Sequence, residues 1–188
     1  MARERRIAIL REIGEVLRTT FDGRLEHAIE AAGQDALEIS RFLVEHFPSY
    51  RDACNFKGRS VSLCKRAQLA SGMLHGARLA RGSTGLARAA KLTVYADYIL
   101  PAILRFLGVS SYTEDLATTV DGHKEMPAGC RFETEIRIST IAAGEIIVQA
   151  ALKYGLELTA LQLDYWLWRS GFGILDKSPH HRVVTTNY

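Results

Sequence analysis

The chain has 188 residues, of which 47% are hydrophobic and 24% are charged, a composition typical of one globular domain with its own core. Its net charge of +3 neither demands nor excludes a nucleic-acid partner, although proteins that grip the DNA backbone usually carry a denser basic stripe. The three cysteines fit no zinc motif, which indicates reduced thiols. Since no signal peptide or bilayer-spanning run is found, we expect a cytoplasmic protein without a membrane partner.

Apolar residues recur at helix spacing through most of the chain, whereas strand patterns are weak throughout. The predicted helices cover residues 3–19, 22–32, 35–45, 60–81, 86–98, 101–107, 132–154 and 159–171, with one more short helix after Ser111. Residues 47–58 are predicted to form a loop and residues 178–188 an extended segment, and no convincing hairpin pair is found. We therefore expect an all-α fold, a single compact helical domain over residues 1–188.

Several of these helices have sequence signals at their ends. Asp22 is expected to cap the second helix, and Ser111 is expected to open a short helix through a capping box with Glu114. Thr159 is expected to cap the last helix, while Pro101 suits the first position of a short one.

Asp97 is the acidic residue with the most unusual surroundings. It lies between Tyr95 and Tyr98 on an otherwise apolar predicted helix, and Pro101 frees nearby carbonyl groups from helical bonding. A carboxylate at a helix irregularity among aromatic rings is suited to stabilising positive charge. On spacing alone, a structural hydrogen bond or salt bridge is the commoner explanation.

Lys65 and the aromatic helix near the C-terminus also have two interpretations each. Lys65 suits contact with a carboxylate or a phosphate, or else belongs to a solvated basic turn. Asp164 and Trp168 lie one helical turn apart, and this aromatic helix offers flat faces for stacking a base, or ordinary core packing.

Arg137 has a simple structural explanation, and the adjacent pair His180 and His181 does not make a metal site. Arg137 follows Glu133 by four residues, the favourable order for a helix ion pair. His180 and His181 are adjacent and lack an obvious third ligand, so no metal site is predicted.

The order of the motifs resembles the queuosine salvage protein family. In chain order they are Phe47-Pro-Ser-Tyr-Arg-Asp52, Lys57-Gly58, Lys65-Arg-Ala-Gln68, Leu92-Thr-Val-Tyr-Ala-Asp-Tyr98 with Pro101, Leu107-Gly108-Val109 with Tyr112, Glu135-Ile-Arg137, Leu163-Asp164 with Leu167-Trp168, and His181-Arg182 with Thr185 and Tyr188. The resemblance covers most of the chain, from about Phe47 to Tyr188.

This resemblance implies a helical fold related to DNA glycosylases and hydrolysis of the N-glycosidic bond of queuosine 5′-phosphate. Queuine, a 7-deazaguanine base, would be released for tRNA modification. The implied substrate is a free nucleotide rather than intact tRNA or DNA, and no metal or organic cofactor is implied.

The resemblance also implies roles for individual residues. Asp97 would stabilise the sugar cation or attack it, and Lys65 would keep Asp97 ionised or contact the ligand. The residues implied to bind the substrate are Tyr95 and Arg137 in the same motifs, Tyr98 and Trp168 at the base or sugar, Asp164 at the base edge, and His181, Arg182 and Tyr188 at the 5′-phosphate.

Three departures from the family pattern bear on the substrate. Ile99 and Ala102 stand where the family usually has arginine and glutamine, Cys130 stands where it has serine, and the N-terminal part is shorter. A related 7-deazaguanine nucleotide or nucleoside is therefore an alternative substrate. Two further alternatives are a protein that binds queuine or a nucleotide without cleaving it, and a glycosylase that acts on a modified base in DNA or RNA.

Overall fold

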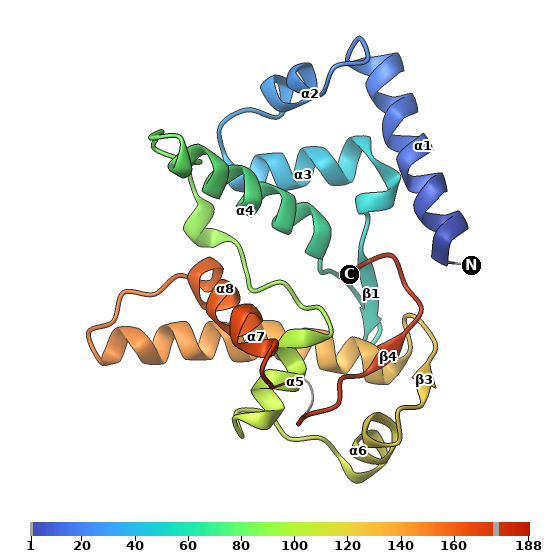
Figure 1. Ribbon diagram of the computed structural model, residues 1–188, viewed down its shortest axis with the longest axis vertical. Helices are drawn as coiled ribbons and strands as arrows, with labels where there is room; N and C mark the ends of the chain where they lie inside the picture. Colours follow the sequence, from blue (N-terminus) through green and yellow to red (C-terminus); the bar gives the residue numbers. More distant parts are fainter. Residues whose placement is uncertain (1, 175–176) are drawn as a thin grey trace. The chain divides into compact units, whose positions relative to one another are not determined.

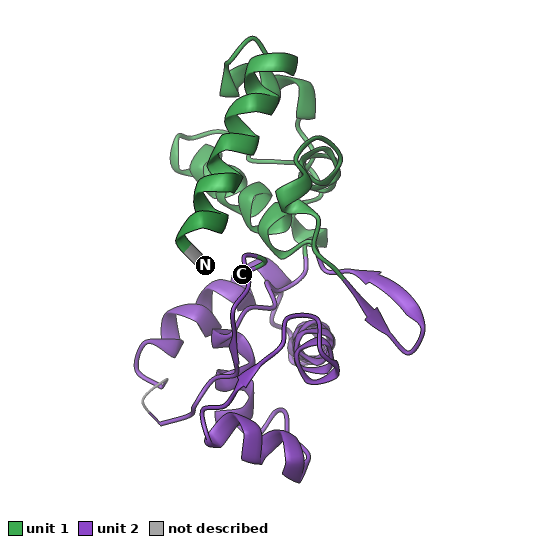
Figure 2. Ribbon diagram, turned by 90° about the vertical axis from the view of Figure 1, so that its right-hand side faces the viewer, with its two compact units in different colours: residues 1–53, 64–92, 187 green, residues 54–63, 93–186, 188 purple. Residues whose placement is uncertain are grey.

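The computed structural model describes residues 2–174 and 177–188 and is mostly helical, with eight α-helices among them (Figure 1). The all-α expectation is thus confirmed in its coarse form. Contacts divide the chain into two compact units (Figure 2): unit 1 holds residues 1–53, 64–92 and 187, and unit 2 holds residues 54–63, 93–186 and 188. That the chain forms a single domain stays a prediction. No helix in the described part of the chain is long and apolar enough to cross a membrane.

Unit 1 is built from helices that bury alanine, leucine, isoleucine and phenylalanine side chains. Its elements are α1 (Ala2–Thr20), α2 (Leu25–Ala32), α3 (Ala36–His46), the 3-10 turn η1 (Pro48–Tyr50), α4 (Lys65–Ala80) and the 3-10 turn η2 (Ala89–Lys91). Asp35 caps α3, because its side chain accepts hydrogen bonds from the backbone N–H groups of Leu37 and Glu38. The predicted first and third helices are confirmed.

The expected cap of the second helix is wrong. Arg24, not Asp22, occupies the N-cap position of α2. Asp22 has a positive φ of 53° in a turn before the helix, and its carboxylate lies 3.3 Å from Nδ1 of His27. The turn at Asp22 and Gly23 therefore starts the helix later than the capping signal indicated.

A β-hairpin replaces the predicted loop and the start of the next predicted helix. Strands β1 (Ala53–Phe56) and β2 (Arg59–Ser62) pair with each other, and α4 begins only at Lys65. The two turn residues, Lys57 and Gly58, both have positive φ, 51° and 78°, as the tight turns of two-residue hairpins require. Gly58 is a sequence signal for such a turn, but lysine is uncommon at the position before it, where Asn, Asp or Gly is preferred.

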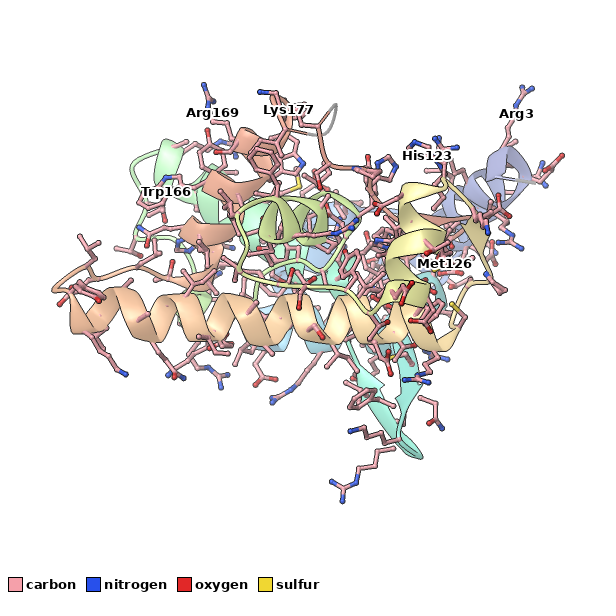
Figure 3. All side chains as sticks on the ribbon, turned by 90° about the horizontal axis from the view of Figure 1, so that it is seen from below. Arg3, His123, Met126, Trp166, Arg169 and Lys177 are labelled. Carbon is pink, nitrogen blue, oxygen red and sulfur yellow. The ribbon has the colours of Figure 1, made fainter. Side chains whose placement is uncertain are left out.

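Unit 2 packs three of its four described helices around an apolar core and adds a short parallel strand pair. Its helices are α5 (Ile99–Phe106), α6 (Glu114–Asp121), α7 (Arg131–Lys153) and α8 (Ala160–Gly171). Strand β3 (Glu125–Met126) pairs in parallel with β4 (Arg182–Val183), within the segment expected to be extended. Met126 also packs in a cluster with Ile136 of α7, beside which it lies in Figure 3. The main core lies between α5, α7 and α8.

Two capping predictions in unit 2 have opposite outcomes. The capping box of α8 is confirmed, since Thr159 Oγ1 accepts from the N–H of Gln162 and the Gln162 side chain accepts from the N–H of Thr159. The capping box at Ser111 is wrong, because α6 starts at Glu114 after Thr113, whose hydroxyl bonds Asp115.

The predicted helix over residues 86–98 is wrong, and this error matters most for the site. Only η2 is helical there, and residues 93–98, called the strap below, run without α-helix to the start of α5. The strap packs closely on α7: a Cβ added to Gly144 would lie 2.8 Å from both methyl groups of Val94. Side chains from α7 and α8 bond the strap's backbone groups, so those groups do not form helical bonds.

Candidate functional site

Asp97 lies near the end of the strap, separated from α5 only by Tyr98, and not on a helix as predicted. Its Oδ1 atom accepts hydrogen bonds from the backbone N–H groups of Ile99, at 2.8 Å, and Leu100, at 3.1 Å. The next residue, Pro101, has no N–H to satisfy, so Asp97 serves the donors of the first turn. The residue is 7% exposed, and Oδ2 makes no hydrogen bond within the described ranges. One carboxylate oxygen is therefore fixed and the other is available.

Tyr95 is held from α8 by Asp164. The carboxylate of Asp164 accepts a 2.7 Å hydrogen bond from the backbone N–H of Tyr95, and both residues are buried. Burial, and secondarily the charge of Asp164, raises the pKa of the Tyr95 hydroxyl well above its usual range. That hydroxyl is buried and has no hydrogen-bond partner in the part of the chain that the structure describes.

Arg137 reaches the strap from α7. Its Nε donates a 3.1 Å hydrogen bond to the carbonyl oxygen of Ala96, the residue before Asp97. Its guanidinium carbon lies 4.8 Å from the centre of the Tyr188 ring, a cation–π contact. The Arg137 side chain is thus buried between the strap and the C-terminal tail, residues 178–188.

His181 supports Tyr188 in the same unit. Its Nε2 atom and the Tyr188 hydroxyl share a hydrogen bond of 3.1 Å, and the two rings meet edge to face. Burial lowers the pKa of His181 to about 4, and His180 and Arg137 add to the effect by charge repulsion. His181 is therefore a neutral imidazole at neutral pH.

The structure brings one set of the predicted residues together and leaves another set apart. In unit 2, Asp164 bonds the backbone of Tyr95, and Arg137 bonds the backbone of Ala96, next to Asp97. Tyr188 contacts both Arg137 and His181.

The remaining predicted residues of unit 2 are more exposed. Tyr98 is 38% exposed, with its ring 4.9 Å from that of His180. Trp168 is 40% exposed and packs edge to face on Phe172, and Arg182 is exposed on β4. Figure 3 shows Arg169, which follows Trp168 in α8, extending from α8 away from α7.

Lys65 belongs to unit 1, where it is the first residue of α4. Its backbone N–H donates to Oδ2 of Asp52, at 3.1 Å, and the Asp52 carbonyl accepts from the N–H of Cys64. Asp52 is buried and shapes the start of this helix, a role that the sequence interpretation missed. No local sequence pattern indicates this role, because Asp52 lies thirteen positions before Lys65, whose backbone N–H donates the hydrogen bond to it.

Two hollows in unit 2 are lined by none of the predicted site residues. A cavity of about 140 Å³ lies between α5, α6 and α7 and is partly lined by hydroxyl side chains. It is smaller than the ~300 Å³ at which ligand pockets usually start. A hollow of about 390 Å³ lies between the hairpin tip and the first turns of α7, lined by Asn55, Phe56, Lys57, Arg131, Thr134 and Glu135.

No group of three or more His, Cys, Asp or Glu side chains is placed to hold a metal ion among residues 2–174 and 177–188. The absence of a metal or organic cofactor stays a prediction.

The protein is thus mostly helical, with two buried carboxylates, Asp97 and Asp164, at the strap, and comparison with known sequences identifies its class. The family model for the queuosine salvage protein matches residues 1–188. The chain belongs to the queuosine salvage protein family, and the resemblance seen in the motifs is confirmed.

Relatives from distant organisms have the same name. The chain is 36% identical over 184 residues to a Dictyostelium discoideum protein, covering 97% of this chain and 57% of that protein. It is 36% identical over 186 residues to one from Sphaerobacter thermophilus, covering 98% and 58%. It is 31% identical over 172 residues to one from Mus musculus, covering 88% and 51%. Each is named queuosine 5′-phosphate N-glycosylase/hydrolase, and the chain spans a little over half the length of these relatives.

Proposed function

We propose that this protein hydrolyses the N-glycosidic bond of queuosine 5′-phosphate and releases queuine. The observation that carries the proposal is Asp97: a buried carboxylate in a family motif, with one oxygen fixed by two backbone N–H groups and the other available. The names of the relatives supply the substrate.

The reaction breaks the bond between C1′ of the ribose and a ring nitrogen of the base. The sugar develops positive charge as the bond lengthens, and Oδ2 of Asp97 stabilises that charge or bonds to C1′. Water then supplies an oxygen to C1′ and a proton to the base nitrogen, which balances the reaction. Because Asp97 is buried, its charge acts through a medium less polar than water, which strengthens its effect.

Other residues have narrower proposed roles. Tyr98 and Trp168 line the base or sugar, and Asp164 contacts the base edge in addition to holding Tyr95. Arg182 is exposed and permanently charged, which suits a phosphate, whereas the low pKa of His181 leaves only a neutral contact there. Lys65 contributes a point charge to the ligand.

The proposal extends to fold and context. We expect a single domain with a fold related to DNA glycosylases, in the cytoplasm, acting on a free nucleotide or nucleoside rather than intact tRNA or DNA. The modest net charge supports a small substrate.

The test incubates the protein with queuosine 5′-phosphate, with queuosine, and with an oligonucleotide that contains queuosine, and measures free queuine by mass spectrometry. Release from the nucleotide is expected. If none of the three is cleaved, the hydrolase proposal fails, and tight queuine binding without turnover would identify a binding protein. Cleavage of the oligonucleotide alone would identify a polymer-specific glycosylase.

The variant Asp97→Asn tests the role of the carboxylate. An asparagine oxygen still accepts the two backbone hydrogen bonds, so the fold is expected to survive while activity falls by at least ~100-fold. Asp22→Asn, at a largely exposed carboxylate in unit 1, is the matched control and should keep full activity. Full activity in Asp97→Asn would show that another group carries the reaction.

A further inference from the structure

The backbone around Asp97 is fixed at consecutive residues by groups from different helices. Asp164 of α8 holds the N–H of Tyr95, and Arg137 of α7 holds the carbonyl of Ala96. The Asp97 side chain then bonds the first turn of α5. The Ala96 carbonyl belongs to the peptide unit that contains the Asp97 nitrogen, so Arg137 acts on the orientation of Asp97 directly.

Arg137 is itself oriented by the tail. The Tyr188 ring covers its guanidinium, and the Tyr188 hydroxyl bonds His181. His181 directly precedes β4, whose first residue, Arg182, pairs with Glu125 of β3. The tail is thus anchored by the pairing of β4 with β3 near its start and by the contact between Tyr188 and Arg137 at its end.

We propose that Arg137 is a positioning residue for Asp97 and that Tyr188 is the clamp that fixes its guanidinium. This inference rests on the proposed function. It assigns Tyr188 to the support of Arg137 rather than to the 5′-phosphate, and Arg137 to the backbone beside Asp97 rather than to the substrate. An arginine that is 3% exposed, with Nε bonded to a carbonyl and its face covered by a ring, is preorganised to hold a backbone group.

The two roles predict different kinetics. A phosphate ligand lost by mutation raises KM for queuosine 5′-phosphate and leaves queuosine, which lacks the phosphate, unaffected. A positioning residue lost by mutation lowers kcat for both substrates by the same factor and leaves both KM values nearly unchanged.

The variants are Tyr188→Leu, Tyr188→Phe and Arg137→Lys, with Tyr154→Leu as control because Tyr154 is 85% exposed. Tyr188→Leu should lower kcat by about 10–100-fold on both substrates, the scale of a small misplacement of a catalytic group. Tyr188→Phe keeps the ring over the guanidinium and should recover much of that loss. Arg137→Lys should fall between wild type and Tyr188→Leu, because an ammonium can donate to Ala96 but cannot present a planar face.

A second measurement is independent of turnover. In protein labelled with ¹³C at aspartate carboxyls, the Asp97 resonance is assigned by its loss in Asp97→Asn. It should shift in Tyr188→Leu, while the resonance of Asp22 stays in place. An unchanged Asp97 resonance, or a KM increase confined to the phosphorylated substrate, overturns the inference. Absence of any turnover by wild type refutes the proposed function instead, and the carboxyl resonance still decides the positioning role.

Discussion

The two carboxylate oxygens of Asp97 have different roles, so the stability of the protein and its proposed activity depend on different atoms of one residue. Oδ1 satisfies two backbone donors at the start of α5, so it contributes to folding. Oδ2 has no such bond to the described residues and is the oxygen proposed to face the sugar.

Asp97→Ala is therefore expected to destabilise the protein, because it leaves the N–H groups of Ile99 and Leu100 without an acceptor. The expected loss is about 1–2 kcal/mol in the free energy of unfolding, the usual value of a helix cap. Denaturant unfolding of Asp97→Ala, Asp97→Asn and the control Asp22→Asn measures it. Equal stability of the alanine and asparagine variants would contradict the capping role.

His181 predicts a dependence of stability on pH. Its folded pKa, about 4, lies below the value of an unfolded histidine, so the unfolded chain takes up the proton first as pH falls. Its contribution to stability is complete above about pH 6.5, is lost between about 6.5 and 4, and changes no further below that range. The loss is at most about 3 kcal/mol.

Denaturant unfolding of wild type and His181→Gln at pH 7, 5 and 4 isolates this contribution, since all other groups titrate in both proteins. The difference in unfolding free energy between the two should shrink as pH falls. His27→Gln, at a half-exposed histidine of unit 1, is the matched control. A constant difference would mean that His181 does not hold its low pKa in the folded state.

At the scale of elements, two helices approach the strap and α5 through glycine. A Cβ on Gly144 of α7 would lie 2.8 Å from both Val94 methyl groups, and one on Gly171 of α8 would lie 2.5 Å from a methyl group of Ile99. These close approaches let α7 and α8 place Arg137 and Asp164 against the strap's backbone.

Gly144→Ala is expected to lower the unfolding free energy by about 1–3 kcal/mol, because the methyl group overpacks the contact with Val94. Gly76→Ala, in α4 where nothing lies within 4 Å of an added Cβ, is the control. It should instead gain up to about 1 kcal/mol from helix propensity. Destabilisation of both variants alike would point to a cause other than the packing at Val94.

The same elements show what local sequence can and cannot predict. Helix α7 and the capping box of α8 were predictable, because apolar spacing and the Thr159–Gln162 pair are local signals. The strap was not, because Tyr95 bonds Asp164 69 positions away and Ala96 bonds Arg137 41 positions away. Asp97 was found as a motif residue, yet its place before α5 depends on those distant bonds. Whether the predicted residues act on substrate stays a prediction.

At the scale of the whole molecule, the division into two units raises the question of cooperativity. The chain passes between the units more than once, since residues 54–63 of unit 2 interrupt unit 1 and residues 64–92 return to it. Such repeated crossing favours one cooperative unfolding transition, in agreement with the proposed single domain.

Two spectroscopic probes test this. Both tryptophans, Trp166 and Trp168, lie in α8 of unit 2, so their fluorescence reports that unit, whereas circular dichroism at 222 nm reports the helices of both. We expect the two denaturation curves to coincide. A fluorescence transition with a distinct midpoint would show that the units unfold separately.

The pairing of β3 with β4 also sets an order in time. The ribosome makes Asp97, Arg137 and Asp164 before it makes β4 and Tyr188, and β4 cannot pair until the chain has passed through α7 and α8. Until the tail docks, the guanidinium of Arg137 lacks its aromatic cover. If Tyr188 clamps Arg137 as proposed, catalytic competence begins only when the tail docks, and the tail is made after the helices that hold the strap.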